Sequence, residues 1–93
     1  MKKLVKENIL EELVSLKGWS YNENTITKDY TFPDFSRAFA FITRVALLAE
    51  KMDHHPTFTN VYNKLNIALQ THDAGGVTKK DLKLAAQIEA LTP

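Results

Sequence analysis

Several residue types are scarce or missing in this chain of 93 residues, and each absence narrows its chemistry. There is no cysteine, so disulfide bonds, thiol nucleophiles and thiolate metal sites are excluded. Only three glycines and three prolines occur, and no segment is repetitive or of low complexity. No apolar run approaches the roughly 20 residues of a membrane span, and the N-terminus lacks the apolar core of a signal peptide. We therefore expect a cytoplasmic protein with no membrane partner.

The chain also has little net charge. Twelve Lys and Arg residues face 11 Asp and Glu residues, which gives a formal charge of +1. These charges are spread along the chain rather than gathered in a basic block, which argues against direct binding to nucleic acid. A hydrophobic content of 44% is typical of a globular protein. The length predicts a single domain over residues 1–93, with a core thin enough to gain from oligomerisation.

The spacing of apolar and β-forming residues predicts an alternation of helices and strands. Helices are predicted at 6–16, 33–52 and 78–91, and strands at 19–21, at 25–32 and in a hairpin between 57 and 69. The order is α-β-β-α-β-β-α. It predicts an α+β fold, a two-layer sandwich in which a four-stranded antiparallel sheet carries three helices on one face.

Both arms of the hairpin alternate as strands with one buried face do. One parity, expected under the long helix, holds Val61, Leu65, Ile67 and Leu69, and the other holds Phe58, Tyr62, Ala68, Gln70 and His72. If Val61 lies opposite Leu65, the same register would set His54 opposite His72, where cross-strand side chains come within roughly 5 Å. A slip of one residue would reverse the faces.

The predicted helix at 33–52 has an apolar stripe that covers about half of its circumference, more than contact with one sheet requires. The stripe comprises Phe35, Ala38, Phe39, Phe41, Ile42, Val45, Ala46, Leu48, Ala49 and Met52, and Leu47 lies outside it. Either the whole stripe packs in the core, or part of it packs on a partner subunit.

The histidines are the first candidates for chemistry, because imidazole exchanges protons near neutral pH. His54, His55 and His72 are the only three in the chain. Each could equally be an ordinary surface or hydrogen-bonded residue. A three-histidine zinc site is a further interpretation. It ranks last, because successive residues of a strand face opposite sides and His54 and His55 would make poor joint ligands.

Other candidate residues also have ordinary interpretations. Glu50 could be a solvated helix carboxylate, and Asp81 could simply complete a capping box with Thr78. Trp19 and Phe58 could be core aromatics. The residues alone leave these alternatives open.

The arrangement of motifs is more specific than any single residue. The motifs are Gly18-Trp19, Phe35 to Phe41, Glu50, His54-His55-Pro56, Asn60 to Lys64, Thr71-His72-Asp73, Gly76, Thr78 and Asp81. In residues and spacing this set resembles the pterin-4a-carbinolamine dehydratase family. The resemblance covers the chain from about the first strand to the last helix.

The resemblance implies a dehydratase that converts 4a-hydroxytetrahydropterin to quinonoid dihydropterin and water, with no cofactor and no metal. The implied catalytic residues are His54, His55 and His72, and the implied substrate-binding or supporting residues are Trp19, Glu50, Phe58 and Asp81. Many relatives have a tryptophan where this chain has Thr57-Phe58, so an indole donor is lost. Which histidine is the acid stays open.

The resemblance also carries expectations about partners. It implies a pterin substrate, a homodimer or homotetramer, and a place beside an aromatic amino-acid hydroxylase. Some relatives stabilise dimers of a transcription regulator. A protein-binding module acting as a dimerisation cofactor is therefore the alternative function, and an exposed apolar stripe on the long helix would favour it.

Overall fold

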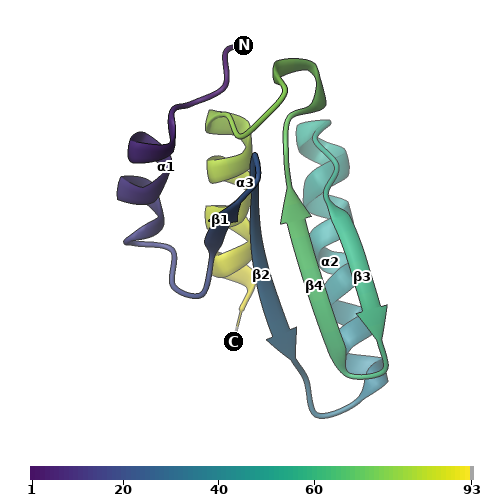
Figure 1. The fold of residues 1–93 in the computed structure, drawn as a ribbon. Coiled ribbons are helices and arrows are strands. Elements are labelled where there is room, and N and C mark those ends of the chain that lie inside the picture. The colour runs from purple at the N-terminus through teal and green to yellow at the C-terminus, as the bar shows by residue number, and fades with distance from the viewer. Residues whose placement is uncertain (93) are drawn as a thin grey trace.

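A computed structural model of the chain describes residues 1–92, which form a sheet with helices on one face (Figure 1). The elements are α1 Lys6–Leu13, β1 Ser20–Asn22, β2 Thr25–Thr31, α2 Phe35–Met52, β3 Thr57–Val61, β4 Lys64–Leu69, the short 3-10 helix η1 His72–Ala74 and α3 Lys79–Leu91. The four strands are antiparallel in the order β1-β2-β4-β3. The predicted α+β sandwich is confirmed. No helix in the described part of the chain is long and apolar enough to cross a membrane.

The covered face of the sheet and the inner faces of the helices form the core. Its fully enclosed large side chains include Ile9, Ile26, Val45, Leu65, Ile67, Leu69, Leu84 and Ile88. Burying one such side chain contributes about 1.5–3 kcal/mol. The other face of the sheet is polar, and there the Asn66 amide donates to Thr27 Oγ1 and Asp29 Oδ1, each at 2.8 Å. This contrast fixes which face of each strand meets the helices.

The predicted hairpin register is wrong by one residue. Val61 pairs with Lys64 and Phe58 with Ile67, so Val61 lies on the open face and is 72% exposed. Two residues, not three, make the turn, and Tyr62 adopts a left-handed φ of 51° there. Short hairpin turns usually place Gly or Asn at such a position, so the sequence carried no clear signal for it. Leu65, Ile67 and Leu69 are buried as predicted.

Because the register is shifted by one residue, the predicted pairing of His54 with His72 is also wrong. Continued past the strand end, the observed register sets Thr71 rather than His72 opposite His54. His72 lies at the start of η1, outside the sheet. Thr71 therefore takes the place that the prediction gave to His72.

The connection between α1 and β1 also differs from the prediction. α1 ends at Leu13 instead of Leu16, and the chain continues through turns to Trp19. The backbone N–H of Trp19 donates to Leu16 O. Gly18 has a φ of 87°, which favours glycine, and a Cβ there would lie 2.8 Å from Lys28 Cε. The first strand thus begins one residue later than predicted, at Ser20.

α2 has defined ends. Asp34 is its N-cap and accepts a hydrogen bond from the Arg37 N–H at 2.8 Å. At the other end Asp53 adopts a left-handed conformation, and the His54 N–H donates to Ala49 O at 3.0 Å. This C-terminal turn reverses the direction of the chain and places His54 and His55 directly after α2.

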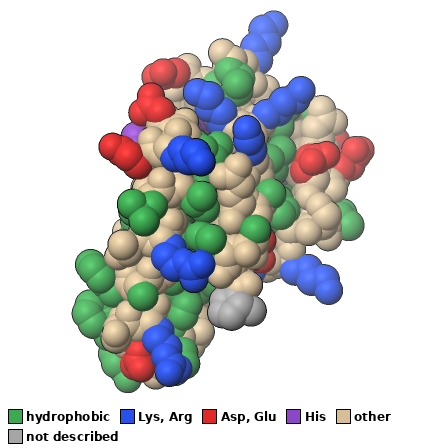
Figure 2. Space-filling model, turned by 180° about the vertical axis from the view of Figure 1, so that it is seen from behind, with side chains coloured by type: hydrophobic (Ala, Val, Ile, Leu, Met, Phe, Trp, Pro, Cys, Tyr) green, Lys and Arg blue, Asp and Glu red, His purple; other side chains and the backbone are tan. Residues whose placement is uncertain are grey.

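Part of the apolar stripe of α2 remains uncovered. Phe35 and Phe39 of the stripe are 49% and 54% exposed, and their rings pack against each other with centroids 5.7 Å apart. Leu47, outside the stripe, is 68% exposed. Apolar side chains gather over this side of the helix-bearing face (Figure 2). The stripe is therefore wider than the monomer's core uses, as the helical pattern predicted.

We expect the chain to self-associate through the exposed stripe of α2, because a domain this small gains from burying such apolar surface. Light scattering at micromolar concentration should give a mass of at least twice 10.6 kDa. Replacing Phe39 by Ser should shift the protein toward monomer. The matched change Val14→Ser, at an apolar side chain directly after α1 that is 82% exposed, should leave the assembly intact. A monomeric parent protein would contradict the prediction.

Candidate active site

Three segments meet at one end of the molecule: the C-terminus of α2, the loop after β4 and the N-terminus of α3 (Figure 1). His54 and His55 follow α2, His72 begins η1, and Asp81 lies in the first turn of α3. Sheet topology and the turn at Asp53 thus bring together residues that are up to 27 positions apart.

His54 and Asp81 form the buried centre of this end. His54 is 8% exposed and Asp81 is fully buried, and His54 Nε2 lies 2.5 Å from Asp81 Oδ1. A carboxylate can only accept, so we assign the proton to Nε2 of His54. The ring is then held in one orientation and one tautomer.

Asp81 also accepts two hydrogen bonds at its other oxygen. Its Oδ2 accepts from the Thr78 N–H and from the Thr71 hydroxyl, each at 2.8 Å. The Thr78 side chain in turn accepts from the helix backbone and completes a capping box. Asp81 therefore completes the predicted capping box with one oxygen, and its other oxygen contacts His54. Both oxygens have partners, which a buried carboxylate requires.

The second ring nitrogen of His54, Nδ1, takes no part in the contact with Asp81. No hydrogen bond to Nδ1 occurs among the described residues, and in neutral imidazole with Nε2 protonated this atom is an acceptor. Trp19 Nε1 is the one fully enclosed side-chain nitrogen or oxygen without a partner in residues 1–92. His54 Nδ1 is thus not fully enclosed, and it retains access to solvent or to a bound molecule.

His55 has a different and much more open setting. Its Nε2 lies 3.0 Å from Glu50 Oε1, and the two side chains are 58% and 81% exposed. By the same reasoning Nε2 of His55 donates, and no hydrogen bond to its Nδ1 occurs among the described residues. An exposed contact of this kind contributes little to stability, typically about 0–1 kcal/mol even when both groups are charged. His54 and His55 point in different directions, as expected for adjacent residues. His54 contacts Asp81 of α3, and His55 contacts Glu50 of α2.

His72 is exposed at the start of η1, directly after Thr71. No hydrogen bond among the described residues joins its side chain to His54 or His55. In the part of the chain that the structure describes, no group of three or more His, Cys, Asp and Glu side chains is placed to hold a metal ion. The interpretation as a three-histidine zinc site therefore gains no geometric support.

The structure does not join the two predicted aromatic residues to the histidines by any polar contact. Trp19 is 6% exposed and belongs to the core, and its indole nitrogen has no hydrogen-bond partner. Phe58 is half-buried, pairs with Ile67 on the covered face of the sheet and packs against the same core. Their roles in substrate binding remain predictions.

Sequence reasoning missed a second polar cluster, at the far end of α3. Lys28 Nζ donates to Glu89 Oε1 at 2.8 Å, and the Tyr30 hydroxyl donates to Glu89 Oε2 at 2.6 Å. Burial and then the bond to Glu89 raise the pKa of Tyr30. Burial alone would raise the pKa of Glu89, but the bonds from Lys28 and Tyr30 outweigh it and lower that pKa. The sequence held one signal for this cluster. Lys28 stands at an inward-facing position of a strand, where a lysine needs a partner.

Replacing Glu89 by Gln should destabilise the protein at pH 7 by about 1–3 kcal/mol, because Lys28 loses a charged acceptor. Because the pKa of Glu89 is lower in the folded state, its charged carboxylate stabilises the fold at pH values above its ordinary pKa of 4.5. This contribution is lost as the pH falls through the folded-state pKa of Glu89. The difference between parent and variant in urea unfolding should therefore shrink from pH 7 to pH 3. Glu7→Gln, on the exposed face of α1, is the control. An equal difference at both pH values would contradict the assignment.

Comparisons with known proteins bear on the whole chain. Residues 2–91 match the family described as pterin 4 alpha carbinolamine dehydratase. A protein of that name from Rhizorhabdus wittichii is 51% identical over 90 residues, which cover 95% of this chain and 93% of the relative. Another from Sulfurisphaera tokodaii is 46% identical over 91 residues, 98% of each chain.

Solved structures agree with this assignment. The crystal structure of a transcriptional coactivator/pterin dehydratase from Brucella melitensis has a TM-score of 0.94 and 39% identity, covering 99% of this chain and 100% of that one. A pterin dehydratase-like RuBisCO assembly factor of the alpha-carboxysome, at 22% identity, has a TM-score of 0.64 over 78% and 84% of the two chains, and shows the fold alone.

Fold and sequence together define the class: an α+β protein in which one sheet carries its helices on a single face, built as pterin dehydratases are. The chain belongs to the pterin-4-alpha-carbinolamine dehydratase family. The family resemblance stated from its motifs is confirmed.

Proposed function

We propose that this protein dehydrates 4a-hydroxytetrahydropterin to quinonoid dihydropterin and water, in support of tetrahydropterin recycling. The observation that carries the proposal is the pair of imidazoles held by carboxylates at one end of the fold. His54 is fixed by Asp81 and His55 by Glu50, and each leaves its Nδ1 unpaired. Family membership supplies the substrate class.

The reaction requires one proton to be delivered and one to be removed. The C–O bond of the carbinolamine breaks, its hydroxyl leaves as water after protonation, and the adjacent ring nitrogen loses its proton as the C=N bond forms. A general acid and a general base suffice for this balance. Imidazoles perform either role near neutral pH, because their protonated and neutral forms are both populated there.

We infer that His54 exchanges a proton through Nδ1. Asp81 keeps Nε2 protonated and compensates a positive charge on the ring, as the aspartate does beside the histidine of a Ser-His-Asp triad. His72, exposed across this end of the molecule, is the candidate for the other proton-transfer role.

His55→Ala should raise KM and leave kcat little changed, because the exposed imidazole beside Glu50 is suited to contacting the pterin rather than to a buried proton transfer. Steady-state kinetics of the purified variant measure both constants. Glu50→Gln, which keeps the shape of the partner, should shift KM in the same direction by a smaller factor. If kcat of His55→Ala falls as far as that of a His54 variant, the binding role is wrong.

The proposed reaction can be tested with the parent protein. Carbinolamine is generated in solution, and its conversion to quinonoid dihydropterin is followed by ultraviolet absorbance with and without protein in catalytic amount. A rate proportional to protein concentration above the spontaneous reaction supports the proposal. Decay at the spontaneous rate, with protein shown to be folded, rejects it.

A second candidate role is that of a protein-binding cofactor of a transcription regulator. The Brucella melitensis relative is described as a transcriptional coactivator as well as a pterin dehydratase. The exposed Phe35, Phe39 and Leu47 of α2 are the feature of this chain that favours such a role. Histidine variants without dehydratase activity would keep this function, whereas Phe39→Ser would lose it.

A further inference from the structure

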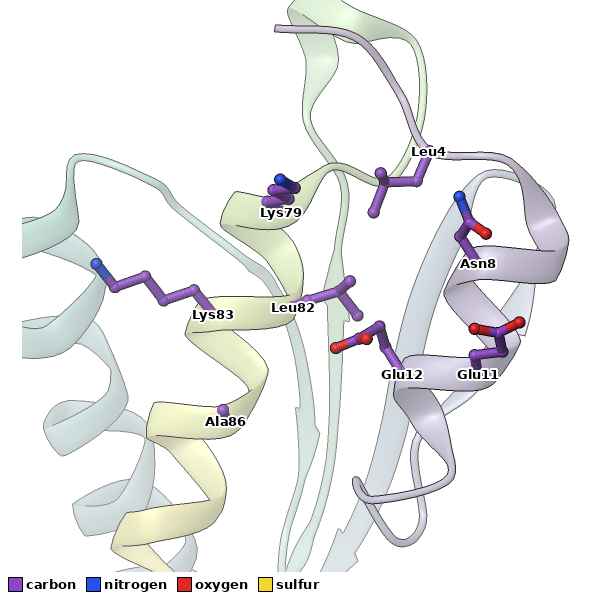
Figure 3. A pocket seen from close by; sticks show the side chains of 8 residues that line it. All are labelled: Leu4, Asn8, Glu11, Glu12, Lys79, Leu82, Lys83 and Ala86. Atoms are coloured by element: carbon purple, nitrogen blue, oxygen red, sulfur yellow. The ribbon is translucent and has the colours of Figure 1, made fainter.

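The segment before α1 runs beside the segment that leads into α3 (Figure 3). The Leu4 N–H donates to Val77 O at 2.7 Å, and the Leu4 side chain points toward Leu82 of α3 (Figure 3). Leu4 and Leu82 are half-buried and pack against the core. Residues 1–5, which we name the N-terminal arm, are therefore anchored by a backbone hydrogen bond and by an apolar side chain.

Gly76 shows how closely the arm approaches the segment before α3. It is buried, and a Cβ added there would lie 3.0 Å from Lys3 Cδ and 3.6 Å from Asn24 Oδ1. A glycine permits such a close approach because it has no side chain. The stem of Lys3 therefore lies directly on this backbone, and the turn between β1 and β2 lies beside it as well.

The same segment forms the base of the loop that carries His72. The Thr71 N–H donates to Gly76 O at 2.9 Å, and the Gly76 N–H donates back to Thr71 O at 3.4 Å. The next carbonyl along the chain, that of Val77, accepts from Leu4. Gly76 and Val77 are both buried. The arm and the start of the loop thus hold the same two-residue segment.

The tip of this loop is exposed and makes mainly internal hydrogen bonds. His72, Asp73 and Gly75 are exposed. Thr71 O accepts from the N–H groups of Ala74 and Gly75, each at 3.1 Å, so the tip is a closed turn that moves together with its base. Segments with exposed backbone and few buried contacts have low local stability. The position of His72 therefore depends on how firmly the base of the loop is held.

We propose that Leu4, through its backbone N–H, is a positioning residue for His72. It holds Val77, and with it the base of the loop, in the place that keeps the His72 imidazole at the histidine end of the molecule. No hydrogen bond joins Leu4 to His72 among the described residues, so the effect is indirect. Its catalytic consequence rests on the dehydratase function proposed above, whereas the order of the loop is a property of the protein alone.

Two variants remove the N–H of Leu4. Leu4→Pro replaces it by a ring carbon. In an ester variant the α-hydroxy acid analogue of leucine is incorporated at position 4, which replaces the N–H by oxygen and keeps the side chain. In both, kcat for carbinolamine dehydration should fall by roughly three- to tenfold, the effect of losing one hydrogen bond. Nitrogen NMR relaxation should show lower amide order parameters at 72–76 than in the parent protein.

Two matched variants keep the Leu4 N–H. Leu4→Ala removes the apolar side chain, so it should reduce stability and leave kcat and the order of the loop at parent values. Lys6→Pro places the same ring at the first position of α1, where proline is tolerated. Val5 before it is already extended, with φ -79° and ψ 155°, as a residue before proline prefers. Lys6→Pro should therefore behave as the parent, and circular dichroism checks that each variant is folded.

A double-mutant cycle tests whether Leu4 acts through His72. In a His72→Ala background, removal of the Leu4 N–H should cause no further loss of kcat, because the residue that it positions is already absent. In a His55→Ala background the three- to tenfold loss should persist. The tautomer of His54 should stay as in the parent in all Leu4 variants, since Thr71 and Thr78 still donate to Asp81.

Three results would overturn the proposal. They are parent kcat and parent order parameters in the folded ester variant, an equal loss in Leu4→Ala, and an undiminished loss in the His72→Ala background. If the parent protein lacks dehydratase activity, the proposed function fails, and the order parameters at 72–76 alone decide whether Leu4 holds the loop.

Discussion

Replacing His54 by Gln should lower kcat for carbinolamine dehydration by roughly 10²–10⁴-fold, which is the usual contribution of a positioned proton-transfer group. Glutamine fills space and forms hydrogen bonds, but it does not titrate. His54→Ala should be no better, since it also leaves a cavity beside Asp81. Pterin affinity, measured by titration calorimetry, should fall much less than kcat because the change removes an interaction of the transition state.

The enclosed Trp19 gives this experiment an internal control. It is the single tryptophan of the chain and belongs to the core, so its fluorescence should be unchanged in a folded His54 variant. His72→Ala should show a comparable loss of kcat if His72 is the second proton-transfer group. Parent rates in His54→Gln, His55→Ala and His72→Ala together would mean that the histidines are not catalytic.

Replacing Asp81 by Asn should affect both catalysis and stability. An amide presents a donor where the carboxylate has an acceptor, so either His54 or the capping group Thr78 loses its hydrogen bond. We expect the free energy of unfolding to fall by about 1–3 kcal/mol. We also expect kcat to fall by roughly 10²–10⁴-fold, because His54 is no longer held in the required tautomer.

Nitrogen NMR of the His54 imidazole distinguishes a loss of ring positioning from a loss of stability in Asp81→Asn. In the parent protein the His54 proton should reside on Nε2, and in Asp81→Asn the other tautomer should be populated. Thr71→Val is the matched control, since it removes one partner of Asp81 Oδ2 and leaves the His54 contact intact. It should reduce stability without changing the tautomer. If Thr71→Val reduces kcat as much as Asp81→Asn does, Asp81 acts only through the stability of α3.

The order and type of the elements could be predicted because local signals agreed with the fold. Asp34 and Thr78 are ordinary helix caps, and alternation in β4 gave the burial of Leu65 and Ile67 correctly. The hairpin register could not be predicted. It depends on a left-handed Tyr62 in the turn, a conformation that its residue type does not favour.

The motifs named candidate residues for the site, but the contacts between them could not be predicted. The motifs pointed to His54 and Asp81, yet their contact depends on the relative placement of two helices. The one-residue slip explains why Thr71, rather than His72, shares Asp81 with His54. The cluster around Glu89 was missed because Lys28 and Glu89 are 61 residues apart and become neighbours only in the packed structure.

The location of a bound pterin tests the central claim most directly. Crystals of the parent protein should be soaked with a stable oxidised pterin and the electron density examined at the end of α2. We predict a pterin ring beside His54 Nδ1, within reach of His55 and His72. Density for the pterin elsewhere, for example between α1 and α3, with the histidine end empty at saturating concentration, would contradict the account.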